Sequence, residues 1–335
     1  MSRHRIHNRR SGTRFEAAAD ETVLAAALRQ GVGLAHQCRS GRCGRCAARV
    51  LAGQVVEAPA PDDPLGAASR AAGRVLLCRA RARSDLVIEA AEAPAGRPVL
   101  QVPVRVSRVA PLARDVMGLW LRPPPGVDLG LAPGQYVDLV WPGGRRRSYS
   151  PASAQGELEL HVRRVAGGWF SERLFGGAVK ARDLLRLEAP FGALRARPAD
   201  PRPVILMAGG TGIAPVYAIL KALAAGRGAA GVHLFWGVRE ARDLYLEDAL
   251  RPLLGERGWA YTPVLSEPAG GWRGARGRVH EAVCGAYGDL SGHLVYAAGP
   301  PAMVEAGAAA FAARGLAPED YLADGFYYAA EGPDA

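Results

Sequence analysis

The sequence predicts a multidomain protein that combines an α+β unit, an antiparallel β unit and an α/β unit. Its 335 residues suffice for two or three domains, each with its own core. Alternating apolar and polar residues, divided by glycine and proline, predict strands in the middle of the chain. In the last third, strand-length and helix-length patterns alternate, which is typical of a parallel α/β sheet. The predicted units are residues 1–92, 99–200 and 203–335.

The composition is that of a globular protein, with 49% hydrophobic and 22% charged residues. A net charge of +10 favours acidic partners, but the arginines are scattered and no nucleic-acid-binding module accompanies them. The longest uncharged run, residues 203–220, is interrupted by glycines and Pro215, which indicates a strand, a turn and a helix rather than a membrane span. No apolar stretch of the secretory kind follows the basic N-terminus. We therefore expect a cytoplasmic protein that binds neither nucleic acid nor membrane.

The first unit begins with a predicted β-hairpin over residues 5–17. A short helix is predicted over residues 20–31, with Asp20 as its N-cap and Gly31 at its end. A loop rich in cysteine, glycine and arginine comes next. Three apolar runs then follow, at residues 48–56, 73–80 and 85–90.

The cysteine-rich loop, "CRSGRCGRC" at residues 38–46, carries three of the five cysteines in a C-x4-C-x2-C arrangement. With a distant fourth thiol, this is the plant-type spacing of a 2Fe–2S cluster, and Cys78 is the most plausible fourth ligand. A zinc site is the alternative, but zinc sites usually contain two C-x2-C pairs and only one is present. The isolated Cys284 is interpreted as a small buried hydrophobic residue. The predicted cluster ligands are Cys38, Cys43, Cys46 and Cys78.

The residues between the thiols fit a negatively charged cluster. Gly41 and Gly44 permit the tight turns that direct backbone N–H groups at sulfur. Arg39, Arg42 and Arg45 would offset the negative charge, and they could present a positive rim to an acidic electron acceptor.

The second unit follows a Pro/Gly/Ala connector at residues 91–99 and ends in a Pro-rich segment at residues 195–203. Its strand patterns predict a small antiparallel barrel. The predicted strands are residues 104–112, 115–123, 135–141, 158–165 and 183–190.

The third unit has four predicted strands and four predicted helices in alternation. The strands are residues 203–208, 231–237, 260–267 and 293–299. The helices are residues 213–225, 243–254, 277–287 and 301–314.

A possible flavin-binding motif, "RRRSYSPAS" at residues 145–153, lies at the end of a strand in the second unit. Arg147 offers a fork for a phosphate, Tyr149 can lie flat on an isoalloxazine ring, and Ser150 can donate a hydrogen bond to flavin N5. A basic hairpin tip with a core tyrosine is the alternative.

A second segment, residues 161–175, supports the flavin hypothesis. In it Gly167 and Gly168 open a helix near Ser171, and such helix starts bind pyrophosphate. A plain loop is the alternative, and we expect no special task for His161.

Two glycine turns in the third unit suggest a nucleotide-binding cleft. Residues 209–212, Gly-Gly-Thr-Gly, join a buried strand to a helix, and Thr211 could hydrogen-bond a ribose or pyrophosphate. Gly299 and Pro300 open a second such turn, and two turns on one sheet frame a cleft. The alternative is a pair of tight turns without a ligand. Arg239 could reach an adenosine ribose or phosphate, or it could be an exposed arginine at a helix start.

Taken together and in this order, these residues resemble the iron–sulfur flavoprotein reductases of bacterial aromatic-ring-hydroxylating dioxygenases, of the naphthalene and benzoate dioxygenase type. The resemblance extends from about residue 5 to Tyr327. It implies an N-terminal β-grasp plant-type ferredoxin domain, an antiparallel β-barrel flavin domain and a C-terminal parallel α/β nucleotide-binding domain. The segments that carry it are "CRSGRCGRC" with Cys78, "RSYS", "HVRRVAGGWFS", "APFG", "GGTGIAP", "GVREARDLYL", "GPPAMV" and "DGFYY".

The resemblance also implies roles for individual residues. Phe326 would cover the flavin face that nicotinamide must reach, and Tyr149, Ser150 and Thr211 would lie closest to the reacting rings. Arg163 would lie along the FAD diphosphate and adenosine. The full set implied for FAD and the nicotinamide is Arg147, Ser148, Tyr149, Ser150, Val162, Arg163, Gly168, Ser171, Gly210, Thr211, Gly212, Arg239, Gly299, Pro300 and Phe326.

The resemblance implies the activity as well. NADH, with NADPH as the alternative, would reduce FAD, and electrons would pass singly through the 2Fe–2S cluster to an oxygenase component or small ferredoxin with an acidic docking face. Many superfamily members have cysteine where this chain has Ala298, but hydride transfer depends on ring alignment, so we expect activity. Alternative clients are a di-iron monooxygenase and a deoxysugar dehydratase of the CDP-glucoseen type. A non-enzyme alternative is a basic, zinc-stapled binding protein.

Overall fold

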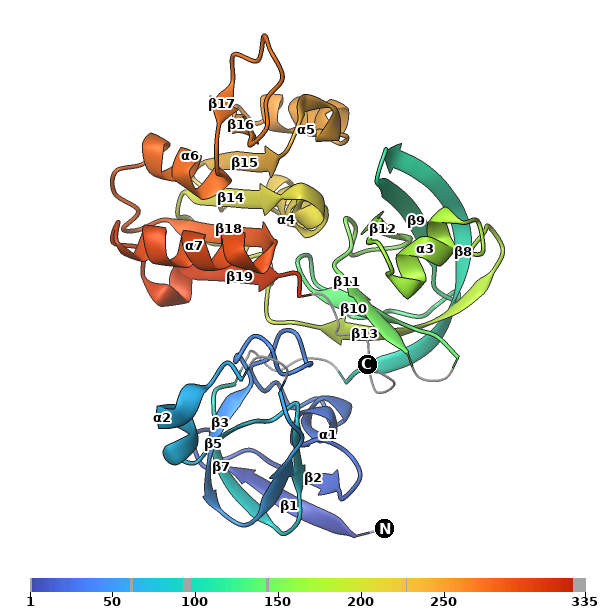
Figure 1. Cartoon of the computed structure of the whole chain (residues 1–335), viewed down its shortest axis with the longest axis vertical. Coiled ribbons are helices and arrows are strands. Elements are labelled where there is room, and N and C mark those ends of the chain that lie inside the picture. The colour runs from blue at the N-terminus through green and yellow to red at the C-terminus, as the bar shows by residue number, and fades with distance from the viewer. Residues whose placement is uncertain (1, 61–62, 93–97, 143–144, 227, 328–335) are drawn as a thin grey trace.

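A computed structural model describes residues 2–60, 63–92, 98–142, 145–226 and 228–327. It contains three principal sheets, which follow one another along the chain (Figure 1). The predicted fold class is confirmed: an α+β unit, an antiparallel unit and a parallel α/β unit. The predicted connector at 91–99 falls largely outside the described residues, and the unit boundaries stay predictions.

The first unit is a five-stranded mixed sheet in the order β2-β1-β7-β3-β5, with β1 and β7 parallel at its centre. The predicted hairpin is present, because β1 pairs antiparallel with β2. A two-stranded sheet, β4 with β6, lies beside it. The elements are β1 (Arg3–Asn8), β2 (Arg14–Ala18), α1 (Val23–Arg29), β3 (Ala47–Ala52), β4 (Val55–Glu57), α2 (Gly66–Ala71), β5 (Arg74–Leu76), β6 (Ala80–Ala82) and β7 (Leu86–Ala90).

Helix α1 starts later than the sequence suggests. Its N-cap is Thr22, whose Oγ1 accepts a hydrogen bond from the Ala25 N–H at 3.2 Å, so the prediction of Asp20 as the cap is wrong. Thr22 has the extended backbone that a cap requires, and its hydroxyl therefore faces the first turn. At the other end Gly31 has φ +73°, a left-handed conformation that stops the helix as predicted.

The second unit is a six-stranded antiparallel sheet in the order β11-β10-β13-β8-β9-β12, with helix α3 packed on its core. Strand β11, which carries the "RSY" motif, is an edge strand whose Tyr149 lies opposite Val137 of β10. The elements are β8 (Leu100–Ala113), β9 (Val116–Arg122), β10 (Tyr136–Val140), β11 (Arg146–Tyr149), β12 (Leu158–Arg163), α3 (Trp169–Phe175) and β13 (Leu184–Phe191).

The third unit is a six-stranded parallel sheet in the order β17-β16-β15-β14-β18-β19. Helices cover both faces, which explains why β14 and β18 are buried along their whole length. The elements are β14 (Val204–Gly209), α4 (Ile213–Ala225), β15 (Val232–Val238), α5 (Glu247–Gly255), β16 (Ala260–Leu265), β17 (Ala275–Arg276), α6 (Val279–Ala286), β18 (Leu294–Gly299), α7 (Pro301–Ala312) and β19 (Tyr321–Gly325).

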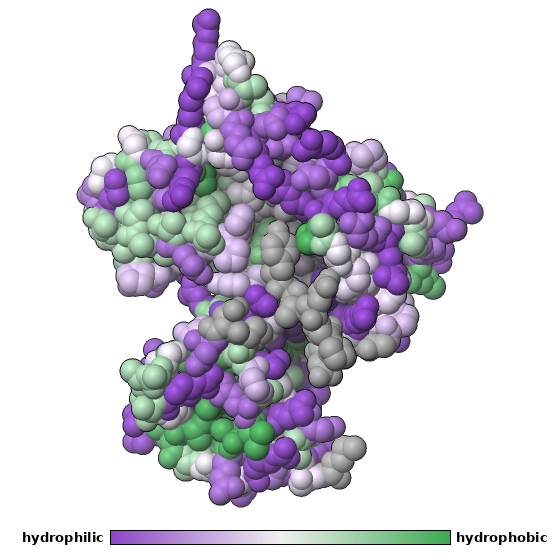
Figure 2. All heavy atoms as spheres, in the orientation of Figure 1, coloured by the Kyte–Doolittle hydropathy of each residue, from purple (hydrophilic) through white to green (hydrophobic). Residues whose placement is uncertain are grey.

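The three units meet at one junction. The cysteine loop of the first unit lies toward β10 and β13 of the second unit and toward the end of β19 (Figure 1). The surface seen in Figure 2 is mostly hydrophilic, with hydrophobic residues gathered on part of the first unit. No helix within the described ranges is long and apolar enough to cross a membrane.

Candidate functional site

The four predicted cluster cysteines come together as two pairs. Cys38 lies beside Cys43, and Cys46 lies beside Cys78, each pair within side-chain hydrogen-bonding contact. The backbone N–H groups of Arg42 and Cys43 both donate to Cys38 Sγ at 3.3 Å. The hydrogen bond from the Cys43 thiol lowers the pKa of Cys38 to about 4 and raises the pKa of Cys43, because the two thiols share one proton. The loop therefore stabilises thiolate at this position, which is the form that binds a metal.

This two-and-two arrangement fits a binuclear cluster. Each iron of a 2Fe–2S cluster takes two protein thiolates, whereas one zinc ion needs its ligands around a single point. In the described part of the chain, no group of three or more His, Cys, Asp or Glu side chains surrounds such a point. Gly41 (φ +87°) and Gly44 (φ +69°) provide the left-handed turns that direct the loop N–H groups at sulfur.

Arg39 does not lie on a positive rim, so that expectation is wrong. Its side chain is only 20% exposed and pairs with the fully buried Asp138 of β10. Its guanidinium carbon lies 3.6 Å from the centroid of the Phe191 ring. Arg45 is exposed and Arg42 is half-buried, so Arg45 remains the clearest candidate for contact with a partner.

Two serines of the flavin motif, Ser148 and Ser150, also form hydrogen bonds with buried carboxyl groups. Ser148 Oγ donates to Asp138 Oδ1 at 2.7 Å, and Ser150 Oγ donates to Asp324 Oδ2 at 2.9 Å. The Tyr149 ring lies 5.7 Å from that of Phe170, and burial raises the pKa of Tyr149. Both serines therefore serve as donors to buried carboxylates on other strands.

Arg147 and the neighbouring helix start form an aromatic corner. The guanidinium of Arg147 lies 5.1 Å from the ring of Trp169, the first residue of α3. The indole Nε1 of Trp169 is buried and has no hydrogen-bond partner among the described residues. An unpaired buried N–H is costly, and a flavin nucleotide rich in acceptors is a ligand that could satisfy it.

Ser171, Gly168 and Val162 shape the same corner from inside. Ser171 Oγ accepts from the Val165 N–H at 3.1 Å and closes the turn before α3. A Cβ at Gly168 would lie 2.7 Å from this oxygen, so the turn needs glycine there. Val162 is fully buried in the core of the second unit, so only its backbone can face a ligand.

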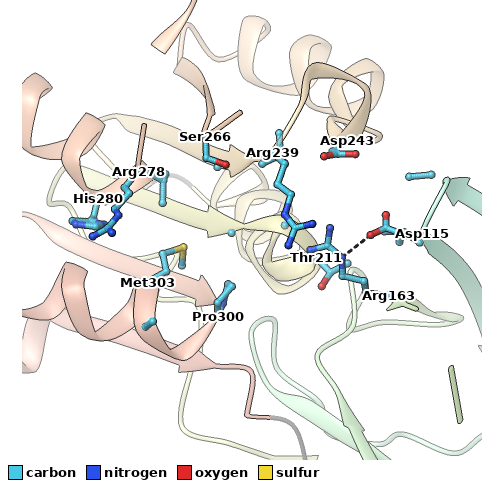
Figure 3. Close-up of a pocket in the computed structure, with 18 of the residues that line it drawn as sticks. Asp115, Arg163, Thr211, Arg239, Asp243, Ser266, Arg278, His280, Pro300 and Met303 are labelled. Atoms are coloured by element: carbon cyan, nitrogen blue, oxygen red, sulfur yellow. Dashed lines mark hydrogen bonds and ion pairs between the residues drawn. The ribbon is translucent and has the colours of Figure 1, made fainter. Parts of the chain in front are cut away.

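The two glycine turns of the third unit open on a cavity of about 460 Å³ (Figure 3). Gly210, at φ +53°, and Thr211 line it from the end of β14, and Pro300 lines it from the start of α7. Arg239 projects into it from the end of β15. Its walls also include groups of the second unit, so the cavity lies between the two units.

Gly212, Gly299 and Phe326 are not among the residues that line the cavity, and they lie where the ends of β14, β18 and β19 meet. A Cβ at Gly212 would lie 2.0 Å from the carbonyl oxygen of Ala298. Gly299 has φ +149°, which strongly favours glycine. Its carbonyl accepts from the Phe326 N–H at 2.8 Å, and the Phe326 ring is half-buried against the core of the sheet.

Two contacts join the second and third units at this cavity. Arg163 is paired with Asp115 at 2.8 Å and lies over the first glycine turn, 3.0 Å from where a Cβ of Gly210 would be (Figure 3). His161 Nδ1 lies 3.0 Å from the Tyr245 hydroxyl. His161, for which we expect no special task in binding a ligand, therefore contributes to the contact between the second and third units.

Sequence reasoning missed the most central residue, Asp324. Its carboxyl group is buried between the three units, and burial raises its pKa. Gln37 Nε2, beside the first cluster cysteine, donates to Asp324 Oδ1 at 3.0 Å, and Ser150 donates to the other oxygen. The segment "DGFYY" drew attention only to its aromatic residue, and Tyr328 lies outside the described residues.

Three family models match the chain in succession. The 2Fe-2S iron-sulfur cluster binding domain matches residues 6–83, the oxidoreductase FAD-binding domain residues 103–195, and the oxidoreductase NAD-binding domain residues 206–308.

Several relatives match nearly the whole length of the chain. An aromatic O-demethylase reductase subunit of Amycolatopsis sp. is 38% identical over 321 residues, 92% of this chain and 94% of the relative. A CDP-6-deoxy-L-threo-D-glycero-4-hexulose-3-dehydrase reductase of Yersinia pestis is 35% identical over 321 residues (94% and 96%). A terephthalate 1,2-dioxygenase reductase component of Comamonas sp. is 35% identical over 339 residues (96% and 97%).

The fold agrees with these relatives. The crystal structure of an Amycolatopsis cytochrome P450 reductase superposes with a TM-score of 0.87 at 35% identity, covering 98% of this chain and 100% of that one. With identity above 30% along nearly the full length, the chain is not a basic, zinc-stapled binding protein. It belongs to the family of reductases that fuse a 2Fe–2S ferredoxin domain to FAD-binding and NAD-binding domains, and it is an NAD(P)H-dependent flavoprotein iron–sulfur oxidoreductase.

Proposed function

We propose that this chain is the reductase component of an aromatic-ring-hydroxylating oxygenase system, carrying electrons from NADH to the oxygenase or to its small ferredoxin. The observation that carries the proposal is the Asp324 junction. There one carboxylate accepts hydrogen bonds from Gln37, beside the cluster cysteines, and from Ser150, in the flavin motif. Direct electron transfer from the flavin to the cluster requires that the flavin motif and the cluster loop lie close together, as these two hydrogen bonds hold them.

The aromatic corner formed by Arg147 and Trp169 supports FAD as the bound group. When bound, FAD supplies the step from a two-electron donor to a one-electron acceptor, and the cluster carries one electron at a time. Arg147 is proposed to bind a phosphate, Tyr149 to pack against the ring, and Ser150 to orient its N5 edge. The orphan N–H of Trp169 is available to the same ligand. Ser148, Val162, Arg163, Gly168 and Ser171 complete the proposed FAD set.

The cavity between the second and third units is the proposed site for the reduced nicotinamide. Gly210 and Thr211 would contact its pyrophosphate and ribose, and Arg239 would contact its adenosine end. Gly212, Gly299 and Pro300 keep the turns tight enough for backbone to approach the ligand. Phe326 is proposed to cover the flavin face until nicotinamide displaces it. We expect NADH as the donor, with NADPH also accepted.

The proposed acceptor is an oxygenase component or small ferredoxin with an acidic docking face. The net charge of +10 and the exposed Arg45 next to the ligand Cys46 favour such a partner. The Comamonas relative is named as a dioxygenase reductase component and the Amycolatopsis relative as a demethylase reductase subunit. Both names support an oxygenase as the client of this chain.

A second candidate client is a deoxysugar dehydratase. The Yersinia relative, named as a reductase for a CDP-deoxyhexulose dehydrase, is as similar to this chain as the dioxygenase relative. The electron path inside the chain would be the same, and only the docking partner would change.

An acceptor panel tests the proposal. The purified holoprotein, NADH and one candidate acceptor are mixed anaerobically, and reduction of the acceptor is followed by its own absorbance. The panel contains an aromatic-ring dioxygenase component, its small ferredoxin, a di-iron monooxygenase component and a CDP-sugar dehydratase. We expect fast reduction of the first or second, weakening as salt rises because the docking is electrostatic. Reduction of the dehydratase alone would overturn the proposed client.

A further inference from the structure

Residues 36–39 of the first unit run directly into the cluster loop, and three of them, His36, Gln37 and Arg39, contact the second unit. The Gly192 N–H donates to His36 Nε2 at 3.3 Å, and the Tyr136 hydroxyl donates to the Gln37 carbonyl at 2.6 Å. These residues, which we name the docking segment, thus hold the cluster loop against the second unit.

Arg39 is the centre of the docking segment. It lies between the ligands Cys38 and Cys43, has φ +52°, and is one of only two residues other than glycine with positive φ in the described chain. A left-handed conformation at a long side chain is unfavourable, and it persists only where other contacts repay it. Here it aims the guanidinium away from the cluster loop and across the boundary between units.

The contacts that Arg39 makes there are strong ones. It pairs with Asp138, whose side chain is fully buried, and its guanidinium stacks on the Phe191 ring at 3.6 Å. Asp138 also accepts from Ser148 Oγ at 2.7 Å, in the flavin motif. A single carboxylate therefore connects the cluster loop to the strand that carries the proposed flavin ligands. Because the Asp138 side chain has no access to water, removal of Arg39 would leave this buried carboxylate with Arg146, whose Nε lies 4.0 Å away, as a more distant cation.

We propose that Arg39 is a positioning residue for electron transfer, which sets the separation of the cluster from the flavin site through Asp138. The inference rests on the proposed electron relay. In the step concerned, one electron leaves the reduced flavin and one reaches the cluster, and no bond forms or breaks. The rate of such a step falls steeply as the distance between flavin and cluster grows. If the cluster loop were released from the second unit, the cluster would therefore be reduced more slowly even if it were intact.

The test compares Arg39→Gln with Arg49→Gln, which removes the same charge from an exposed position of the same unit. Each holoprotein is mixed with NADH in an anaerobic stopped-flow instrument, and the flavin and cluster absorbances are followed separately. We expect normal flavin reduction in both variants, with cluster reduction at least tenfold slower in Arg39→Gln only. Arg39→Lys should restore part of the rate, because it retains the charge but not the planar fork.

Two further measurements make the result decisive. Distance measurement by pulsed electron spin resonance, between the reduced cluster and a spin label on the second unit, should show a broader distribution in Arg39→Gln. Asp138→Asn, which lies outside the cluster loop, should slow cluster reduction by a similar factor, and the double variant should be no slower than either single one. Normal cluster reduction in Arg39→Gln or Asp138→Asn would overturn the inference. Failure of NADH to reduce the flavin in the unaltered protein would instead overturn the electron relay.

Discussion

Two buried carboxylates, Asp138 and Asp324, govern the junction at the scale of single residues. Isolated charges in a protein interior are costly, and these are retained with defined partners. Asp138 is paired with an arginine, whereas Asp324 has two neutral donors, Gln37 and Ser150. Burial raises the pKa of Asp324, and no nearby cation offsets this effect.

The first prediction at this scale concerns Cys78. Cys78→Ser removes one thiolate of the Cys46–Cys78 pair, so the 2Fe–2S cluster should be lost or damaged. Electron delivery to protein acceptors should fall at least tenfold, while ferricyanide reduction, which takes electrons at the flavin, should persist. Visible absorbance, iron content and the two activities measure this. Cys284→Ser is the matched control, and it should keep the cluster; a normal cluster in Cys78→Ser would show the ligand to be wrongly assigned.

Local spacing predicted the thiols but not the carboxylates. Three of the four cysteines lie within one short loop, so their proximity is built into the sequence. Gln37 and Asp324 are 287 positions apart and meet only through the packing of all three units. No spacing rule reports a contact of this kind. Arg39 was misjudged for the same reason, because its neighbours suggest an exposed basic loop while its partners come from β10 and β13.

At the scale of elements, the turn between β14 and α4 is set by backbone packing. The turn passes so close to the end of β18 that a Cβ at Gly212 would lie 2.0 Å from the Ala298 carbonyl oxygen. Real Cβ atoms do not approach that closely, so one strand end would have to move. Because Gly210 and Pro300, which follow the two strand ends, line the proposed nucleotide cavity, a shift there would disturb binding as well as folding.

A glycine pair tests this packing. Gly212→Ala should lower the unfolding free energy by about 1–3 kcal/mol, as overpacking does, and should raise the Kd for NAD(H). Gly285 lies in helix α6, where an added Cβ would have no other atom within 4 Å. Gly285→Ala is therefore the control, and it should be neutral or stabilising by about 0.5–1 kcal/mol. Thermal unfolding and calorimetric titration measure the two effects. An unchanged Kd and midpoint in Gly212→Ala would show that the turn relaxes without cost.

The elements with a clear apolar pattern followed from the sequence, whereas β19 and α2 did not. Helix α4 and its flanking strand are buried and uninterrupted, so their pattern is strong. Strand β19 was missed because its five residues mix apolar, acidic and glycine positions, and it becomes a strand only by pairing with β18. Helix α2 was missed because it buries none of its residues and so has no apolar stripe.

At the scale of the molecule, an ion-pair network joins the segment between the second and third units to the start of β19. Arg202 donates to Asp200 at 2.8–2.9 Å and pairs with Asp320 at 2.8 Å. The hydrogen bonds from Arg202 lower the pKa of Asp200 to about 2. The order of the three units was evident from the sequence, but contacts that fix their docking, such as this one, were not.

This network predicts a pH dependence of stability. In the unfolded chain Asp200 takes up a proton near pH 4, whereas in the folded chain it stays charged until about pH 2. Its contribution is therefore complete above about pH 4 and is lost as the pH falls toward 2. The difference in thermal midpoint between the unaltered protein and Asp200→Asn should shrink between pH 5 and pH 3. A constant difference over that range would contradict the assignment.

The separation of Gln37 from Asp324 has a consequence for biosynthesis. The first unit closes its own sheet when β7 pairs with β1, so it can fold while the ribosome is still translating the rest. The surface around Gln37 then stays uncovered until residue 324 has been synthesised. A nascent chain stalled before that point would carry a folded first unit that lacks its contact with Asp324 and with the flavin motif.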